Sequence, residues 1–341
     1  MDELGAIIQN AQNTKDISSL RKHCVHGYGN NSQRRASYRL LLDIPNAFTP
    51  TIAPKYDFKD IDLVKKDVHR SYSSIQSQEC KTYRKEKLLR VLSSLFERHN
   101  DLTYYQGFQE IAIIVLTFAR ESFALQILEA LALGPLHCFL GQTLGGIETI
   151  LDFSFSLLRI VDNDIYVSFE KSDIQSHLLV SFIVTFFAHN VPDIESGLRF
   201  LDFFIASHPL IPTYTIISII SLEREKMMKR NFDPNTILSI LQDTNFTVDQ
   251  IINNTVEIYQ KYPPNVVLNM DKSLQISEDC IYLSPRISFP YPFPSFPFYN
   301  PISLQSYTSH LEGYKDKSFV AKILKDLAIA ASIGMRIIFS E

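Results

Sequence analysis

The sequence is poor in the residues that build common metal and disulfide sites. Its 341 residues include four cysteines and no tryptophan. The cysteines are far apart and form no Cys-x-x-Cys pair; they are Cys24, Cys80, Cys138 and Cys280. This spacing favours reduced thiols that pack as small apolar groups over a disulfide framework or a paired zinc site. We therefore expect no metal site.

Glycine is also scarce, with 11 residues in the chain. Gly141, Gly145 and Gly146 lie close together, but no Lys-Ser/Thr pair follows them to complete a phosphate-binding loop. The sequence contains no Gly-x-Ser-x-Gly nucleophile motif and no His-Glu-x-x-His zinc motif. The nine histidines are scattered, so we interpret one such as His208 as a partly buried, hydrogen-bonded residue rather than a ligand. We expect neither a self-contained active site of a common type nor a cofactor of the chain's own.

Strong charge and long apolar runs are absent too. The formal net charge is −4, which gives no reason to expect nucleic acid as a partner. The uncharged run 178–188 is far shorter than the ~20 residues that span a bilayer, so we predict a buried core helix there. In the run 209–222, Pro209 and Pro212 indicate the start of a helix. The first residues lack the basic and apolar regions of a signal peptide, so none is expected.

Helical periodicity dominates the chain from residue 33 to about 263. The stretch 81–99 is the clearest case, because one stripe of residues recurs at spacings of three and four. The stripe consists of Leu88, Leu92, Leu95, Phe96 and His99. We expect further helices at 108–120, 123–133, 146–161, 174–188, 194–206, 214–229 and 248–261. The connections are short, as between antiparallel neighbours in a helical bundle.

Two segments rich in Ile and Val, 182–184 and 216–220, leave strands open as an alternative. No hairpin turn flanks either one. We therefore predict an all-α, multi-helix domain over residues 31–265, preceded by a helix and a loose connection at 1–30.

Beyond the pair Pro263-Pro264 the composition changes. Residues 284–301 hold six prolines and six aromatic residues, a density that blocks both helix and central strand. We predict a linker at 266–318, either extended in solvent or lying along the domain. The last segment, 319–341, is helical in pattern, but its uncharged run 327–335 is too short to span a membrane. It can lie in the membrane interface as an anchor or pack on the domain.

Three short motifs occur in a fixed order. They are Arg34-x-x-x-Tyr38, Val64-x-x-Asp67-x-x-Arg70 and Tyr104-x-Gln106-Gly107. Each alone has an ordinary explanation, because helical arginines are usually solvated or paired and Tyr-x-Gln-Gly can mark a helix boundary. Their order and spacing carry more information than any one of them.

In these motifs the sequence resembles the TBC domain family, the Rab GTPase-activating proteins. The signatures of that family are R-x-x-x-W, I-x-x-D-x-x-R and Y-x-Q-G. Tyr38 stands for the tryptophan and Val64 for the isoleucine, whereas the third signature matches outright. The stretches 67–71, 104–111 and 201–214 are similar to the endoplasmic-reticulum-anchored branch, which regulates Rabs of early secretory traffic. The resemblance covers about residues 30–265.

The resemblance implies a catalytic arginine and a catalytic glutamine. Hydrolysis of GTP passes through a loose transition state with charge on the phosphoryl oxygens, which a planar guanidinium supplied in trans can stabilise. Arg70 matches the family's arginine finger. Gln106 matches its glutamine finger, whose amide can accept from the attacking water and donate toward the phosphate.

The remaining motif residues have supporting roles by the same resemblance. Asp67 precedes Arg70 by three residues and can pair with it on a helix face, so we expect it to aim the guanidinium. Tyr104 is expected to be a positioning or contact residue. Gly107 is expected to allow a turn or a close approach of the backbone. Arg34 belongs to the structural motif. Tyr38 can fill much of the space of the family tryptophan if its hydroxyl finds a partner.

The expected function is therefore that of a GTPase activator that lends residues in trans, not a self-contained enzyme. The partner is a Rab GTPase in its GTP form, which itself binds the GTP and Mg²⁺. The resemblance implies a role in traffic between endoplasmic reticulum and Golgi, at the cytosolic face of those membranes or else in the cytoplasm, with membrane contact through 319–341. The alternative is a catalytically silent scaffold that keeps the TBC fold and only binds a Rab or a membrane partner. An unrelated helical adaptor would leave the order of the motifs unexplained.

Overall fold

The structure is a computed structural model that describes residues 2–45, 50–141, 145–277 and 280. Within these residues the regular elements are α-helices and two 3-10 helices, η1 and η2, with no strand, so the all-α prediction is confirmed. The elements are α1 (Glu3–Thr14), α2 (Ser18–Lys22), η1 (His23–His26), α3 (Asn31–Leu41), α4 (Ile61–Arg70), α5 (Gln78–Arg98), α6 (Phe108–Phe118), α7 (Glu121–Leu133), α8 (His137–Leu140), α9 (Gly145–Val161), α10 (Asn163–Lys171), η2 (Ser176–Leu179), α11 (Val180–Val184), α12 (Ile194–Ala206), α13 (Ile211–Leu222), α14 (Arg224–Met228), α15 (Pro234–Gln242), α16 (Val248–Lys261) and α17 (Pro264–Met270).

Local sequence explains where several of these helices begin. In α3 the Asn30 side chain accepts from the backbone of Gln33 while the Gln33 side chain reaches back, which completes a capping box. Ser77 caps α5 by accepting from the backbone N–H of Cys80. Pro212 lies in the first turn of α13, where a missing N–H costs nothing.

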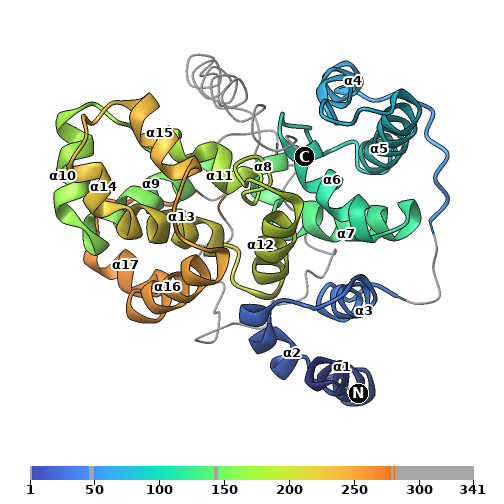
Figure 1. Ribbon diagram of the computed structural model, residues 1–341, viewed down its shortest axis with the longest axis horizontal. Helices are drawn as coiled ribbons and strands as arrows, with labels where there is room; N and C mark the ends of the chain where they lie inside the picture. Colours follow the sequence, from blue (N-terminus) through green and yellow to red (C-terminus); the bar gives the residue numbers. More distant parts are fainter. Residues whose placement is uncertain (1, 46–49, 142–144, 278–279, 281–341) are drawn as a thin grey trace.

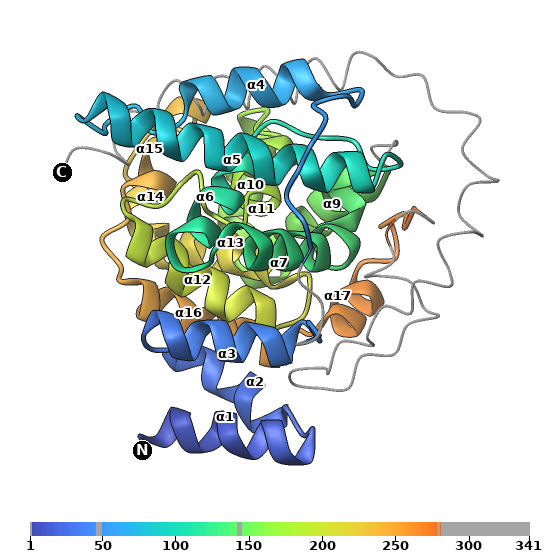
Figure 2. The same cartoon turned by 90° about the vertical axis from the view of Figure 1, so that its right-hand side faces the viewer.

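The helices form two groups joined through α12. Figure 1 shows α4–α7 in one group and α9, α10 and α13–α17 in the other, with α12 between them and α1–α3 along one edge. Helix α5 packs on α4, α6 and α7, and α13 packs on α9 and α16. Figure 2 shows α4 and α5 lying side by side at the end of the molecule opposite α1. The predicted stripe of α5 supplies core residues, because Leu88, Leu92, Leu95 and Phe96 are buried.

The prediction of a loose connection near the N-terminus is wrong. Helices α2 and η1 occupy this region, and their apolar residues Leu20 and Cys24 are fully buried. The buried Tyr28 donates from its hydroxyl to the carbonyl of Leu20 at 3.0 Å. The segment therefore packs into the core rather than connecting across solvent.

The single helix predicted for 174–188 is also wrong. The structure has η2 and the short helix α11, and the chain then turns at Phe186 and Phe187, whose φ angles are +49° and +63°. These residues are buried, as expected, but they are not one helix. The predicted helix 214–229 is likewise divided into α13 and α14. Helices α10 and α15 were not predicted.

The C-terminal predictions fall largely outside the described residues. Helix α17 crosses the predicted boundary at residue 265, and the structure describes residues up to 277 and residue 280. Most of the predicted linker, and the whole segment 319–341, lie beyond the part that is described. Within the described part, no helix is long and apolar enough to cross a bilayer.

Candidate functional site

Arg70 is the last residue of α4 and its guanidinium is accessible. Its side chain is 43% exposed and donates through Nη2 to Oδ1 of Asp67, one turn earlier. The carboxyl end of a helix carries partial negative charge, which favours a cation at this position. The pair thus holds one side of an exposed guanidinium, whose other N–H groups can bind a ligand.

Asp67 is the buried centre of this arrangement, with 2% of its surface exposed. Its Oδ2 lies 2.8 Å from the hydroxyl of Tyr104, which is also buried. Burial raises the pKa of Asp67, while the hydrogen bonds from Tyr104 and Arg70 oppose this rise. Burial and the neighbouring Asp67 raise the pKa of Tyr104 well above its ordinary value, so its hydroxyl keeps the proton that it donates.

The two residues before Gln106 fix the backbone of this segment through hydrogen bonds to other parts of the fold. The backbone N–H of Tyr104 donates to Oδ2 of Asp60 at 2.9 Å, and the hydroxyl of Tyr105 donates to the carbonyl of Val184 at 2.6 Å. Gln106 itself is partly exposed, and its side-chain amide makes no hydrogen bond to the described residues. A fixed backbone therefore presents an amide that is still able to bind.

Gln109, which the sequence analysis did not single out, joins the two motifs. Its Oε1 lies 2.8 Å from the Tyr104 hydroxyl and accepts from the backbone N–H of Gly107 at 2.9 Å. That N–H belongs to the peptide that follows Gln106. A chain of close polar contacts therefore runs from Arg70 through Asp67 and Tyr104 to Gln109 and the peptide beside Gln106. The hydroxyl of Tyr104 has one proton for two neighbouring oxygens, so at any moment it donates either to Asp67 or to Gln109.

Gly107 has a conformation that side chains rarely adopt. It precedes α6 with φ +109°, and a Cβ built there would lie 2.8 Å from Cγ2 of Thr185. Glycine alone avoids both the strain and the clash. The turn that presents Gln106 thus depends on this glycine.

The first motif lies apart from this chain, in a buried cluster around Asp202. Asp202 accepts two hydrogen bonds from the guanidinium of Arg34, at 2.8 and 3.1 Å, and one from the Tyr38 hydroxyl at 2.8 Å. It also accepts from the backbone N–H of Tyr28 at 2.9 Å. The hydroxyl that distinguishes Tyr38 from the family tryptophan therefore has a partner. This cluster ties α3 to α12 and has a structural character.

No group of three or more His, Cys, Asp or Glu side chains in the described part is arranged to hold a metal ion. The geometry instead provides an exposed guanidinium and an accessible amide, held in register by buried hydrogen bonds. Such a pair can stabilise charge and orient a water on a ligand that another molecule brings.

Comparison with known proteins agrees with the order of the motifs. The profile of the Rab-GTPase-TBC domain matches residues 33–228, which is more than half of the chain. The chain belongs to this family. The matched range includes α3, α4 and the start of α6, so all three motifs of this TBC chain lie inside it.

Among curated proteins, this TBC chain is similar to the GTPase-activating protein gyp10 of Schizosaccharomyces pombe. The two are 32% identical over 185 residues, which cover 52% of this chain and 49% of gyp10. It is 24% identical to TBC1 domain family member 20 of Homo sapiens over 260 residues, covering 73% of this chain and 64% of that protein. The chain thus spans about half to two-thirds of the length of these relatives.

A solved structure shares the fold. The crystal structure of the Ypt/Rab-GAP domain of Gyp1p superposes with a TM-score of 0.52 at 13% identity, covering 76% of this chain and 98% of that one. At this identity the likeness concerns the fold alone. It agrees with the helical TBC architecture described above.

Proposed function

We propose that this chain is a GTPase-activating protein for a Rab-type small GTPase, to which it lends Arg70 and Gln106. The family membership and the names of the relatives support an activator of this kind. The observation that carries the two roles is the chain of close polar contacts from Arg70 to the Gln106 peptide. It couples two accessible polar groups that are 36 positions apart in sequence.

In this mechanism Arg70 stabilises the charge that develops on the phosphoryl oxygens during hydrolysis. Its planar fork of donors spans two oxygens, and the buried Asp67 holds the fork by one side. An arginine supplied in trans contributes about 10³ to 10⁵ in rate, or roughly 4 to 7 kcal/mol of barrier.

Gln106 orients the attacking water in the same step. Its amide oxygen accepts from the water while its NH₂ group donates toward the phosphate. Because Tyr104 and Tyr105 anchor the preceding backbone, the backbone that presents the amide is held in place before the partner arrives. Pre-positioning of this kind lowers the entropic cost of reaching the transition state. The partner in its GTP form brings the nucleotide and Mg²⁺.

The test of this function is a hydrolysis screen. The full chain is mixed at substoichiometric amounts with each member of a panel of GTP-loaded Rabs, and phosphate release is followed. We expect multiple-turnover stimulation of at least one Rab. If Rabs bind in their GTP form but none is stimulated, the chain is the catalytically silent scaffold instead.

We further propose that the chain acts at the cytosolic face of endoplasmic reticulum or early secretory membranes. Support comes from the resemblance to the endoplasmic-reticulum-anchored branch and the similarity to TBC1 domain family member 20. The proposed contact is the segment 319–341, which lies outside the described residues. Deletion of 319–341 should move the protein from the membrane fraction to the cytosol, whereas full-length Arg70→Ala should stay on membranes. An unchanged distribution after deletion contradicts the anchor.

A further inference from the structure

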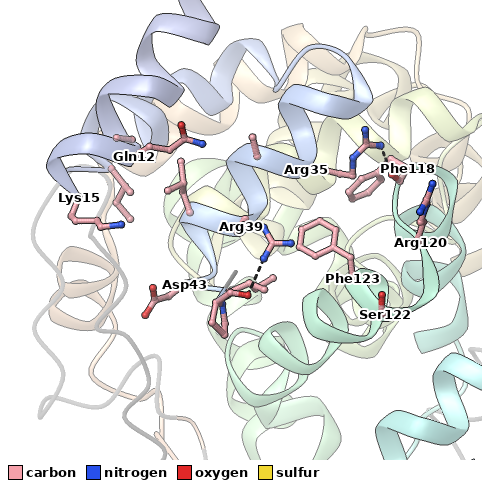
Figure 3. A pocket seen from close by; sticks show the side chains of 15 residues that line it. Gln12, Lys15, Arg35, Arg39, Asp43, Phe118, Arg120, Ser122 and Phe123 are labelled. Carbon is pink, nitrogen blue, oxygen red and sulfur yellow. Dashed lines mark hydrogen bonds between the residues drawn. The ribbon is translucent and has the colours of Figure 1, made fainter. Parts of the chain in front are cut away.

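A basic pocket lies between α1, α3 and the start of α7, away from the candidate site. Its volume is about 1180 Å³. It contains four cationic side chains and one acidic side chain, Asp43; the cations are Lys15, Arg35, Arg39 and Arg120. Figure 3 shows Lys15 and Arg120 at opposite sides of the pocket, with Arg39 between them and Asp43 on the side away from Arg120.

The pocket and the candidate site lie at opposite ends of one helix. Gly107 precedes the first residue of α6, whereas the carbonyl of Phe118, its last residue, accepts from Arg35 in the pocket at 2.8 Å. A helix of this length, 11 residues, separates its ends by about 16 Å. A ligand in the pocket would therefore not occupy the place of the nucleotide of a GTPase bound at Arg70.

None of the three guanidiniums in the pocket forms a salt bridge with a described acidic residue. Arg35 donates one N–H to the carbonyl of Phe118. Arg39 donates one N–H to the carbonyl of Pro45 at 2.9 Å, and its guanidinium lies 4.6 Å from the centre of the Phe123 ring. Each guanidinium has five donors, so most remain available. The side chains of Lys15 and Arg120 make no hydrogen bond or ion pair with any described residue.

The start of α7 adds further donors to this cluster of cations. Arg120 is the N-cap residue and provides no side-chain cap, and the first backbone N–H with an intrahelical partner is that of Ala124. Ser122 and Phe123, from the first turn, line the pocket. The one acidic residue of this turn, Glu121, is instead bound to Arg90 at 2.7 and 3.0 Å. A helix start with free N–H groups and a nearby serine suits a phosphate.

The geometry points to a binding site for a small anion that carries several phosphate groups on one scaffold. A single phosphate would leave much of the 1180 Å³ unused and could not reach cations at both sides of the pocket. A phosphorylated polyol places several phosphates around one ring and fits this spread of charge. The same chemistry occurs free in solution and as the headgroup of a membrane lipid, and the experiment separates the two sources.

The test uses the full chain and calorimetric titration with inositol hexakisphosphate, with inorganic phosphate as a second probe. We expect saturable binding of the polyphosphate at one site and much weaker binding of phosphate. Arg120→Gln should weaken the polyphosphate by about tenfold or more, since it removes charge-assisted hydrogen bonds from a residue with no structural partner. Equal affinity for inorganic phosphate would contradict a site for several phosphates.

Lys171→Gln is the matched control. Lys171 is exposed at the end of α10, so this substitution removes the same charge as Arg120→Gln but far from the pocket. It should bind like the parent, and thermal melts should show that both variants are folded. Equal weakening by Arg120→Gln and Lys171→Gln would reduce the effect to net charge and overturn the site. If poly-glutamate at an equal concentration of charge displaces the polyphosphate, the polyphosphate site is overturned and the pocket binds an acidic peptide instead.

Vesicle flotation assigns the source of the phosphates. Neutral phosphatidylcholine vesicles are compared with vesicles that also contain a phosphatidylinositol bisphosphate. Binding to the second kind alone, lost in Arg120→Gln, identifies a lipid headgroup. Binding of soluble polyphosphate without flotation identifies a free ligand. Absence of binding in both assays contradicts the proposal, and this outcome is independent of whether the chain activates a GTPase.

Discussion

The hydroxyl of Tyr104 lies 2.8 Å from Oδ2 of Asp67, so a residue of the third sequence motif is bound to a residue of the second. Through the other oxygen of the same carboxylate, this contact reaches Arg70. The two motifs are therefore one unit in the folded chain. A change in either one is expected to disturb the group presented by the other.

The first prediction concerns this link. Tyr104→Phe removes the hydroxyl and leaves Asp67 with one buried oxygen unsatisfied. We expect stimulated hydrolysis to fall roughly tenfold to a hundredfold, the range for a lost hydrogen bond to a charged group. In a double-mutant cycle, Tyr104→Phe and Asp67→Asn should be strongly non-additive in kcat/KM, because both break the same connection.

Tyr105→Phe is the control for that cycle. It removes an adjacent, partly buried hydroxyl, which donates to the carbonyl of Val184 and has no contact with Asp67. Its effect should add to that of Asp67→Asn. If the cycle with Tyr104→Phe is additive as well, the hydrogen-bonded chain does not couple the two motifs.

The second prediction concerns the turn at Gly107. Gly107→Ala places a Cβ at φ +109° and 2.8 Å from Thr185, and we expect it to cost about 1 to 3 kcal/mol of stability together with most of the activity. Gly141→Ala is the control, because its φ is −69° and, among the described residues, its Cβ would meet only the carbonyl of His137 at 3.9 Å. Urea melts and hydrolysis rates measure both. Parent-like behaviour of Gly107→Ala would show that the turn tolerates a side chain.

The third prediction concerns the buried cluster of the first motif. Asp202→Asn leaves the guanidinium of Arg34 buried without its counter-charge, which costs about 3 to 5 kcal/mol when one partner of a buried pair is removed. Asp249→Asn is the control: its side chain is 72% exposed beside Arg199, and we expect about 0.5 kcal/mol or less. Chemical denaturation compares the two. Equal costs would mean that the Asp202 cluster is not a stabilising unit.

The fourth prediction concerns pH. Burial lowers the pKa of His208 to about 3, and its Nδ1 accepts from the backbone N–H of Leu210 at 3.1 Å. The unfolded chain binds this proton below about pH 6.5 and the folded chain does not, so stability falls as pH falls from 6.5 toward 3. Between pH 6.5 and 5 the loss from this residue is about 2 kcal/mol.

His208→Asn keeps an acceptor for Leu210 and removes the titration, so its stability should change less between pH 6.5 and 5 than that of the parent. Urea melts at both pH values give the comparison. Identical slopes for the parent and His208→Asn would contradict the assignment.

The long helix α5 could be predicted from its periodicity, whereas the bends within the run 174–188 could not. The stripe of α5 alternates with charged residues, so its buried face could be read from spacing alone. The run 174–188 is apolar all round and has no glycine or proline to mark its bends, so nothing in the sequence distinguishes a long buried helix from the observed η2, α11 and turns. Tertiary packing around Phe186 and Phe187 decides the conformation there.

Contacts between segments that are distant in sequence could not be predicted either. Asp202 lies 168 positions from Arg34. Gln109 looks like an ordinary helix residue, and its role is visible only once Tyr104, five positions earlier, is seen to contact the distant Asp67. One signal was available: a lone aspartate in the apolar stretch 201–206 has to find a cationic partner when that helix is buried. No comparable signal marks Gln109, because a glutamine near a helix start needs no buried partner.

The central claim is that Gln106 replaces the glutamine of the GTPase and acts together with Arg70. Before that claim is tested, Arg70→Ala should lower stimulated hydrolysis by about a thousandfold or more in a folded protein. Arg70→Lys should not restore it, because a point ammonium cannot span two oxygens as the planar fork does. Activity of Arg70→Ala close to that of the parent would remove the arginine from the mechanism.

The most direct measurement uses a stimulated Rab whose own switch glutamine is changed to alanine. Single-turnover GTP hydrolysis by this Rab is measured with the parent chain and with Gln106→Ala. If Gln106 supplies the amide, the parent chain should keep much of its stimulated rate on the altered Rab, and Gln106→Ala should be severely defective on the unaltered one. Loss of stimulation on the altered Rab, together with full activity of Gln106→Ala, would show that only the arginine is lent.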